Sequence, residues 1–164
     1  IILLKLATLI RGLSGVRPAL ADALLALLNA GIVPVIPAKG SCGASGDLAP
    51  LAHLGAALIG IGDVFHRGTR KPAAAALAEE GLAPFTLGPK EGLALVNGTQ
   101  ASTALAIEGL FRAEELFAGA LVAGALSLEA GGGTAAAFDP RIQDCRGQEG
   151  QRAVAAILRR LLHG

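Results

Sequence analysis

Three residue types are missing from this 164-residue chain, which contains no methionine, no tryptophan and no tyrosine. Aromatic residues make up only 3% of the sequence, so large rings cannot dominate the core. The two cysteines, Cys42 and Cys145, lie far apart, which excludes a disulfide-rich scaffold and a cysteine-based metal site. We therefore expect a reduced, cytoplasmic protein without a bound metal.

An excess of one charge is lacking too, because 14 Lys and Arg residues balance 13 Asp and Glu residues. The net charge of +1 excludes a basic field that would hold nucleic acid. The most apolar stretch runs only from Leu116 to Leu128 between two glutamates, and about 20 residues are needed to span a bilayer. We predict a buried core helix there, and neither nucleic acid nor a membrane as a partner.

Alanine and leucine supply most of the apolar mass, with 34 and 28 residues in a chain that is 52% hydrophobic. Both are strong helix formers, which predicts an all-α fold, a helical bundle with long core helices. The chain starts within an apolar helical pattern and not with methionine, so we interpret it as a fragment. No linker or repeat interrupts residues 1–164, which predicts a single domain.

Helix signals recur along the chain. Pro18 and Gly31 mark the start and end of one helix, and Asp47 offers an N-cap carboxylate to another. A small hairpin is a further possibility at 63–71, around Arg67-Gly68. The predicted helices cover residues 1–10, 18–30, 48–60, 73–80, 99–130 and 151–162, with a short helical turn at Asp139-Pro140.

Helical packing does not require the glycine-rich loop at residues 39–53, KGSCGASGDLAPLAH. One hypothesis is an ordinary turn that ends in a helix cap. A second is chemical: if the Gly46 nitrogen closes onto the Ala44 carbonyl carbon, two waters are lost and Ser45 becomes an exocyclic methylene. Gly46 suits this closure because it lacks a Cβ, and the flanking glycines reach strained dihedrals.

Other candidate sites are weaker. The glycines precede a helix, as in phosphate-binding loops, but no Gly-Lys-Ser/Thr follows them and no dinucleotide motif is present, so we expect no nucleotide. His53, His66 and His163 form no metal constellation with the cysteines. Asn97-Gly98 is a favoured turn pair, and Asn97 has a purely structural explanation on that basis.

The sequence resembles the aromatic amino acid ammonia-lyases in two motifs, GSCGASGDLAPLAH and, further along the chain, EGLALVNGTQAST. GLSGVRP near residue 15 and FDPRI near residue 140 extend the resemblance over nearly the whole chain. The resemblance implies a 4-methylidene-imidazol-5-one group (MIO) formed from Ala44, Ser45 and Gly46. It also implies that Asn97 helps to hold this group and the substrate, that Leu48 faces the pocket, and that the enzyme is a homotetramer with shared active sites.

The run Asn97-Gly98-Thr99-Gln100 is similar to the histidine-specific members of this family. That similarity implies elimination of ammonia from L-histidine to give trans-urocanate, in histidine degradation. Phenylalanine or tyrosine lyases and MIO aminomutases remain alternatives, as does a non-catalytic helical assembly module with an uncyclised loop. Since the family's catalytic tyrosines and carboxylate-binding arginine lie outside these residues, we expect the fragment alone to be inactive.

Overall fold

The computed structural model describes residues 1–41 and 45–163. The chain divides into two compact units, an N-terminal unit, Ile1–Ala106, and a C-terminal unit, Ile107–Gly164. Helix α6, Gln100–Ala130, begins in the first unit and continues into the second. The boundary thus falls inside a helix and not in a linker, and the single domain expected from the sequence stays a prediction.

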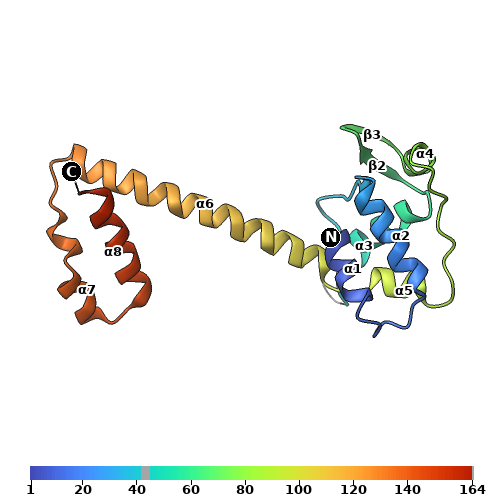
Figure 1. The fold of residues 1–164 in the computed structure, drawn as a ribbon, viewed down its shortest axis with the longest axis horizontal. Coiled ribbons are helices and arrows are strands. Elements are labelled where there is room, and N and C mark those ends of the chain that lie inside the picture. The colour runs from blue at the N-terminus through green and yellow to red at the C-terminus, as the bar shows by residue number, and fades with distance from the viewer. Residues whose placement is uncertain (42–44, 164) are drawn as a thin grey trace. The chain divides into compact units, whose positions relative to one another are not determined.

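Short helices build most of the N-terminal unit (Figure 1). In the described residues they are α1 Ile2–Leu9, α2 Pro18–Asn29, α3 Leu48–Leu58, α4 Ala73–Glu79 and α5 Glu91–Val96. Pro18 is the first residue of α2, where its missing N–H breaks no intrahelical hydrogen bond, and Gly31 follows the helix with a φ of +65°. The predicted helices in this unit are confirmed; α5 is too short to show a helical period in the sequence.

A small antiparallel sheet lies at one edge of this unit, beside α4 (Figure 1). Its strands, in the order β1-β2-β3, are β1 Val33–Pro34, β2 Asp63–His66 and β3 Thr69–Pro72. Arg67 and Gly68 join β2 to β3 with φ values of +50° and +75°, as a tight hairpin turn requires. The predicted hairpin is confirmed. Strand β1 lies outside every predicted helix and strand, and it tolerates Pro34 because it is an edge strand.

The hydrophobic core belongs to the N-terminal unit and is made mainly of leucine and alanine. Helices α1 to α4 each contribute one apolar face, and α5 adds Leu95. The fully buried apolar side chains are Leu20, Leu24, Ile32, Leu51, Leu54, Val64, Ala73 and Ala76. The low aromatic content and the helix-forming composition therefore lead to the all-α fold that the sequence predicts, with one small sheet.

The C-terminal unit contains the rest of α6, the 3-10 helix η1 Ala135–Phe138, and helices α7 Pro140–Arg146 and α8 Glu149–Leu161. Figure 1 shows α7 and α8 side by side. Gln143 joins these elements: its amide nitrogen donates to the Ala137 carbonyl at 2.7 Å, and its amide oxygen accepts from Gln151 at 2.7 Å. The predicted turn at Asp139-Pro140 and the predicted final helix are confirmed.

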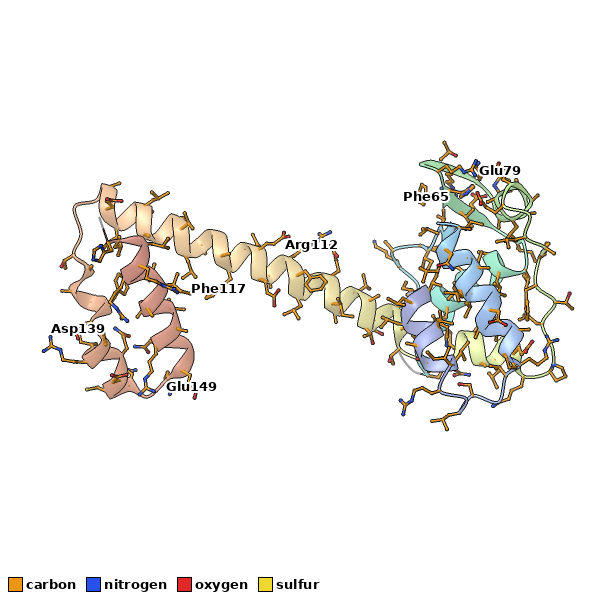
Figure 2. All side chains as sticks on the ribbon, viewed as in Figure 1. Phe65, Glu79, Arg112, Phe117, Asp139 and Glu149 are labelled. Carbon is orange, nitrogen blue, oxygen red and sulfur yellow. The ribbon has the colours of Figure 1, made fainter. Side chains whose placement is uncertain are left out.

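Helix α6 matches the predicted range 99–130 within one residue, but the predicted buried core helix at Leu116–Leu128 is not buried in the described chain. Leu105, Leu116 and Leu126 are 73%, 75% and 60% exposed, and Phe117 projects from the helix (Figure 2). Apolar periodicity identifies side chains that are expected to be buried. It does not show which segment packs against them. Among the described helices, none is both long enough and apolar enough to cross a membrane.

Candidate active site

The glycine-rich loop lies against the segment that leads into α6. Gly46 and Gly98 form an isolated parallel bridge, and the backbone N–H of Asp47 donates to the Gly98 carbonyl at 2.8 Å. These two segments are separated by about fifty residues in the sequence. The junction joins the residues just before α3 to those between α5 and α6, and α3 packs against α5 (Figure 1). The fold therefore joins the two motifs that carry the sequence resemblance.

Both glycines at the junction adopt backbone conformations that other residues rarely reach, with φ values of +106° at Gly46 and +134° at Gly98. A Cβ atom on Gly46 would lie 2.5 Å from the Gly98 carbonyl oxygen and 3.1 Å from the Gly98 nitrogen. A Cβ on Gly98 would lie 2.3 Å from the Gln100 side-chain oxygen. Glycine at position 46 thus permits a backbone contact that any side chain would prevent.

Asp47 anchors the junction. Its carboxylate is buried and accepts hydrogen bonds from the Ser102 backbone nitrogen at 2.7 Å, the Ser102 hydroxyl at 2.6 Å and the Ser41 hydroxyl at 3.0 Å. The bonds from Ser102, and then the weaker one from Ser41, lower the pKa of Asp47 although burial raises it. Asp47 therefore stays ionised and ties the glycine-rich loop to the first turn of α6.

This arrangement corrects the predicted role of Asp47 as the side-chain cap of the following helix. Asp47 precedes α3, but its carboxylate makes no capping hydrogen bond to α3. It instead accepts from a backbone N–H in the first turn of α6, where the partial positive charge of the helix favours an anion. A sequence shows which helix follows an aspartate, but not which distant helix end its side chain reaches.

Lys5 holds the same junction from the other side. Its side chain is 1% exposed, and its ammonium donates to the carbonyl oxygens of Ala94 at 2.9 Å and Asn97 at 2.6 Å. Burial lowers the pKa of Lys5 to about 8. Lys5 is not among the predicted site residues, although the sequence holds a signal: Lys5 shares with Ile2, Leu6 and Leu9 the buried face of α1.

An ion pair fixes the opposite end of α5. Glu91, the first residue of the helix, is 1% exposed and accepts from the Arg17 guanidinium at 2.6 Å and 2.9 Å. Its carboxylate also accepts from the backbone nitrogens of Gly88 at 2.6 Å and Arg17 at 3.1 Å. Arg17 first, and then the Gly88 N–H, lower the pKa of Glu91 to about 2. Helix α5 is thereby held at both ends by buried charged groups.

An open pocket of about 570 Å³ lies beside the junction. Its polar wall includes Ser41, Asp47 and Ser102, and its apolar wall includes Ile36 and Leu105. The carboxylate of Asp47 is already engaged by both serines. The pocket therefore offers a mainly apolar surface next to a hydrogen-bonded floor.

Comparison with known proteins identifies the family. The family model described as aromatic amino acid lyase matches residues 1–164. The chain belongs to the aromatic amino acid lyase family. It is 62% identical to the histidine ammonia-lyase of Paracidovorax citrulli over 160 residues, which are 98% of this chain and 31% of the relative. The chain thus spans about a third of the length of the curated relatives that it matches.

Solved structures of the aromatic amino acid lyase family share the fold. Histidine ammonia-lyase from Trypanosoma cruzi matches with a TM-score of 0.90 and 39% identity, over 96% of this chain and 31% of that chain. Tyrosine aminomutase from Streptomyces globisporus matches with a TM-score of 0.89 and 42% identity, over 98% of this chain and 30% of that chain. The same backbone therefore accompanies more than one substrate and more than one reaction.

The predicted site residues of this lyase family occupy different positions around the junction. Ala44 lies outside the described residues, Ser45 is exposed, and Gly46 contacts Gly98. Leu48, the first residue of α3, is 37% exposed. Asn97 follows α5, and its amide nitrogen donates to the Leu93 carbonyl at 3.2 Å. The roles assigned to these five residues by resemblance stay predictions.

Ser41 and Ser102 are part of the junction, but neither is among the predicted site residues. Ser102 is in the NGTQAST motif and Ser41 is in the glycine-rich loop, so both stand in segments that carry the resemblance to the lyase family. Each pairs with Asp47 across the junction. The sequence signal for both residues is a hydroxyl side chain in each of the two motifs that contact each other through Gly46 and Gly98.

Proposed function

We propose that the full-length protein is a histidine ammonia-lyase, which eliminates ammonia from L-histidine to give trans-urocanate. The 62% identity to a histidine ammonia-lyase supports the choice of substrate. We also propose that the protein uses an MIO group formed from Ala44, Ser45 and Gly46. The observation that carries this proposal is the backbone contact between Gly46 and Gly98, which leaves no room for a Cβ at position 46.

The described residues fit such a group. In the proposed cyclisation the Gly46 nitrogen bonds to the Ala44 carbonyl carbon, whose oxygen leaves as water, and the Ser45 hydroxyl leaves as a second water. Gly46 already has a φ of +106°, which a residue with a side chain would adopt only with strain. The neighbouring Asp47 is fixed through its backbone and its carboxylate. A loop fixed on one side of the reacting atoms loses less freedom when it closes.

When present, the exocyclic methylene is an electrophile that activates the substrate amine as a leaving group. Asn97 is proposed to hold this group and the polar end of the substrate with its side-chain amide. Leu48 is proposed to form an apolar wall at the start of α3. The low pKa of Asp47 makes its carboxylate a weak proton acceptor, so we assign it to anchoring and not to removal of the β-proton.

Assembly is the second part of the proposal. The described part of α6 exposes the apolar side chains of Leu110, Phe111, Leu116, Phe117 and Leu126. Apolar exposure on this scale is typical of an interaction surface. We propose a homotetramer, as the resemblance to the family implies, in which other parts of the full-length protein or other subunits cover this face. The 164 residues alone, which contain no tyrosine, are expected to be inactive.

One alternative has an observation in its favour. Tyrosine aminomutase from Streptomyces globisporus is 42% identical to the chain, a little more than the 39% for the histidine ammonia-lyase structure. A tyrosine-directed enzyme is therefore the second candidate. Its product is distinguishable, since an aminomutase returns an amino acid and a lyase releases ammonia.

The test is a substrate assay on the full-length protein. L-histidine, L-phenylalanine and L-tyrosine are supplied separately, and both ammonia and the ultraviolet absorbance of the unsaturated acid are followed. We expect ammonia and urocanate from histidine alone, and loss of this activity after borohydride treatment, which reduces an electrophilic methylene. Ammonia from tyrosine, or a β-amino acid without ammonia, would support the alternative. Activity on histidine that resists borohydride would exclude the proposed prosthetic group.

A further inference from the structure

Lys5 is a charged residue on the face of α1 that is otherwise made of buried apolar side chains. It is 1% exposed and shares the buried face of α1 with Ile2, Leu6 and Leu9. In the part of the chain that the structure describes, no carboxylate pairs with its ammonium. Burial of an ammonium without an anion is costly, and an apolar side chain at this position would avoid that cost.

The partners of Lys5 are two backbone carbonyls at one end of α5. The last carbonyls of a helix have no intrahelical partner, and a cation there is favoured by the partial negative charge of the helix end. Lys5 satisfies the carbonyl of Ala94 at 2.9 Å and that of Asn97, the residue after the helix, at 2.6 Å. Lys5 thus fixes the peptide unit that joins Asn97 to Gly98.

That peptide unit is in direct contact with the glycine-rich loop. The Gly98 nitrogen would lie 3.1 Å from a Cβ on Gly46, and the Gly98 carbonyl accepts from the Asp47 N–H at 2.8 Å. The other end of α5 is fixed by the pair of Glu91 and Arg17. A displacement of the Asn97–Gly98 peptide would therefore be passed directly to the backbone of Gly46.

We propose that Lys5 is a positioning residue for formation of the prosthetic group: by binding the carbonyl of Asn97 it presses the Asn97–Gly98 backbone against Gly46, so that the loop is held ready to cyclise. This inference rests on the proposed function. It adds a residue of α1 to the site, more than ninety positions before Asn97 in the sequence. The lowered pKa of Lys5, to about 8, agrees with a buried cation whose hydrogen-bond partners, among the described residues, are backbone carbonyls.

The test compares three forms of the full-length protein: wild type, Lys5→Met and Lys5→Arg. Methionine keeps the length and apolar stem of the side chain but removes the donors, whereas arginine restores charged donors. Trypsin releases the peptide from Gly40 to Arg67, because Lys39 and Arg67 are the flanking cleavage sites. The fraction of this peptide that lacks two water molecules is measured by mass spectrometry on folded protein only.

A core variant controls for simple loss of stability. Leu20, on α2, is fully buried and makes none of the contacts at the junction, so Leu20→Ala destabilises the fold without touching Lys5 or Asn97. We expect Lys5→Met to lower the cyclised fraction roughly tenfold or more, because small displacements of reacting groups have large effects on rate. Lys5→Arg is expected to recover much of it, and Leu20→Ala to leave it unchanged.

The possible outcomes separate the two proposals. A wild-type peptide without the mass deficit contradicts the proposed function itself. If the wild-type peptide has the deficit and Lys5→Met is cyclised to the same extent, the proposed role of Lys5 is wrong. The proposed function is not affected by that outcome. An equal loss in Leu20→Ala also overturns it, since general stability then explains the effect. If Lys5→Met does not fold, the Lys5→Gln variant, which retains amide donors, is measured in its place. A cyclised fraction between those of wild type and zero supports the role of Lys5, and a fraction equal to that of wild type overturns it.

Discussion

The two units of the chain differ in how they are held together. The N-terminal unit buries a continuous leucine and alanine core and adds three buried charged residues, Lys5, Asp47 and Glu91. In the described part of the C-terminal unit, by contrast, the buried residues are Ala125, Gln143 and Ala155. The first unit therefore has its own hydrophobic stabilisation, at about 25 cal/mol per Å² of apolar surface buried. The second presents apolar surface that gains this stabilisation only when something else covers it.

The difference also explains where the candidate site lies. The junction between Gly46 and Gly98 keeps two backbones in contact in conformations that residues with side chains rarely adopt. Such an arrangement persists only where the surrounding structure determines it fully. The N-terminal unit provides this through its core and through Asp47. An exposed helix face with few packed neighbours would let such a contact relax.

Removal of a core side chain tests the comparison most strongly. Leu24 is fully buried in α2, whereas its neighbour Leu25 is 42% exposed. Leu24→Ala is expected to lower the free energy of unfolding by about 2–5 kcal/mol, because it removes buried methyl groups and leaves a cavity. Leu25→Ala, the matched control, should cost less than about 1 kcal/mol. Denaturant unfolding of the full-length protein measures both, and equal losses would show that the described core is not the main source of stability.

A second substitution sharpens the account of the junction. Gly46→Ala places a Cβ 2.5 Å from the Gly98 carbonyl oxygen, whereas Gly62→Ala meets nothing within 4 Å although Gly62 also has a positive φ of +81°. Both substitutions pay about 1–2 kcal/mol for the backbone conformation, and Gly46→Ala adds a similar amount of overpacking. We expect roughly 3 kcal/mol of destabilisation in Gly46→Ala and complete loss of cyclisation. Thermal unfolding and the peptide mass report the two effects, and Gly62→Ala should still cyclise.

The pH dependence of stability tests the buried charge of Lys5. Its pKa is about 8 in the folded chain and 10.5 ordinarily, so between these values the unfolded chain holds a proton that the folded chain has released. The free energy of unfolding should therefore rise with pH from about 8 to 10.5, by roughly 3 kcal/mol from this residue. The rise should be absent in Lys5→Met. Unfolding curves at several pH values compare the two proteins, and identical profiles would show that Lys5 is not buried as a cation.

The smallest expected effect concerns the exposed face of α6. Leu116 is 75% exposed, so Leu116→Asp should leave the core of the N-terminal unit and cyclisation of the loop intact. If subunits cover this face, the charge should weaken assembly by about tenfold or more. Light scattering over a range of concentrations measures this, with Glu115→Gln as a control on the same helix. An unchanged assembly in Leu116→Asp would mean that this face is not an interface between subunits.

The fold was largely predictable because its signals are local. Leucine periodicity, Pro18 and Gly31 delimit α2, and Arg67-Gly68 marks the hairpin. Strand β1 was not predictable, since Pro34 reads as a loop residue until the neighbouring β2 supplies its partner. The site was predictable only as two motifs, because the contacts that join them depend on tertiary structure. Asp47 is the instructive case: its sequence neighbour is α3, but its carboxylate binds α6.

Lys5 makes contacts that could not be predicted from the sequence. A single lysine in an apolar helical pattern is a visible departure from the period, but the sequence does not reveal what the ammonium binds. Its partners are backbone carbonyls, which have no signature in the sequence, about ninety residues away. Contacts from a side chain to a distant backbone are therefore the part of this site that only a structure reveals.

Cyclisation of the glycine-rich loop is measured by the mass of the tryptic peptide from Gly40 to Arg67, taken from the full-length protein beside a Ser45→Ala control. If Ala44, Ser45 and Gly46 cyclise, the wild-type peptide has a deficit of two water molecules. The Ser45→Ala peptide should lack this deficit, because the alanine side chain has no hydroxyl to eliminate. An unmodified wild-type peptide from well-folded protein would contradict the account and leave an ordinary turn held between two helices.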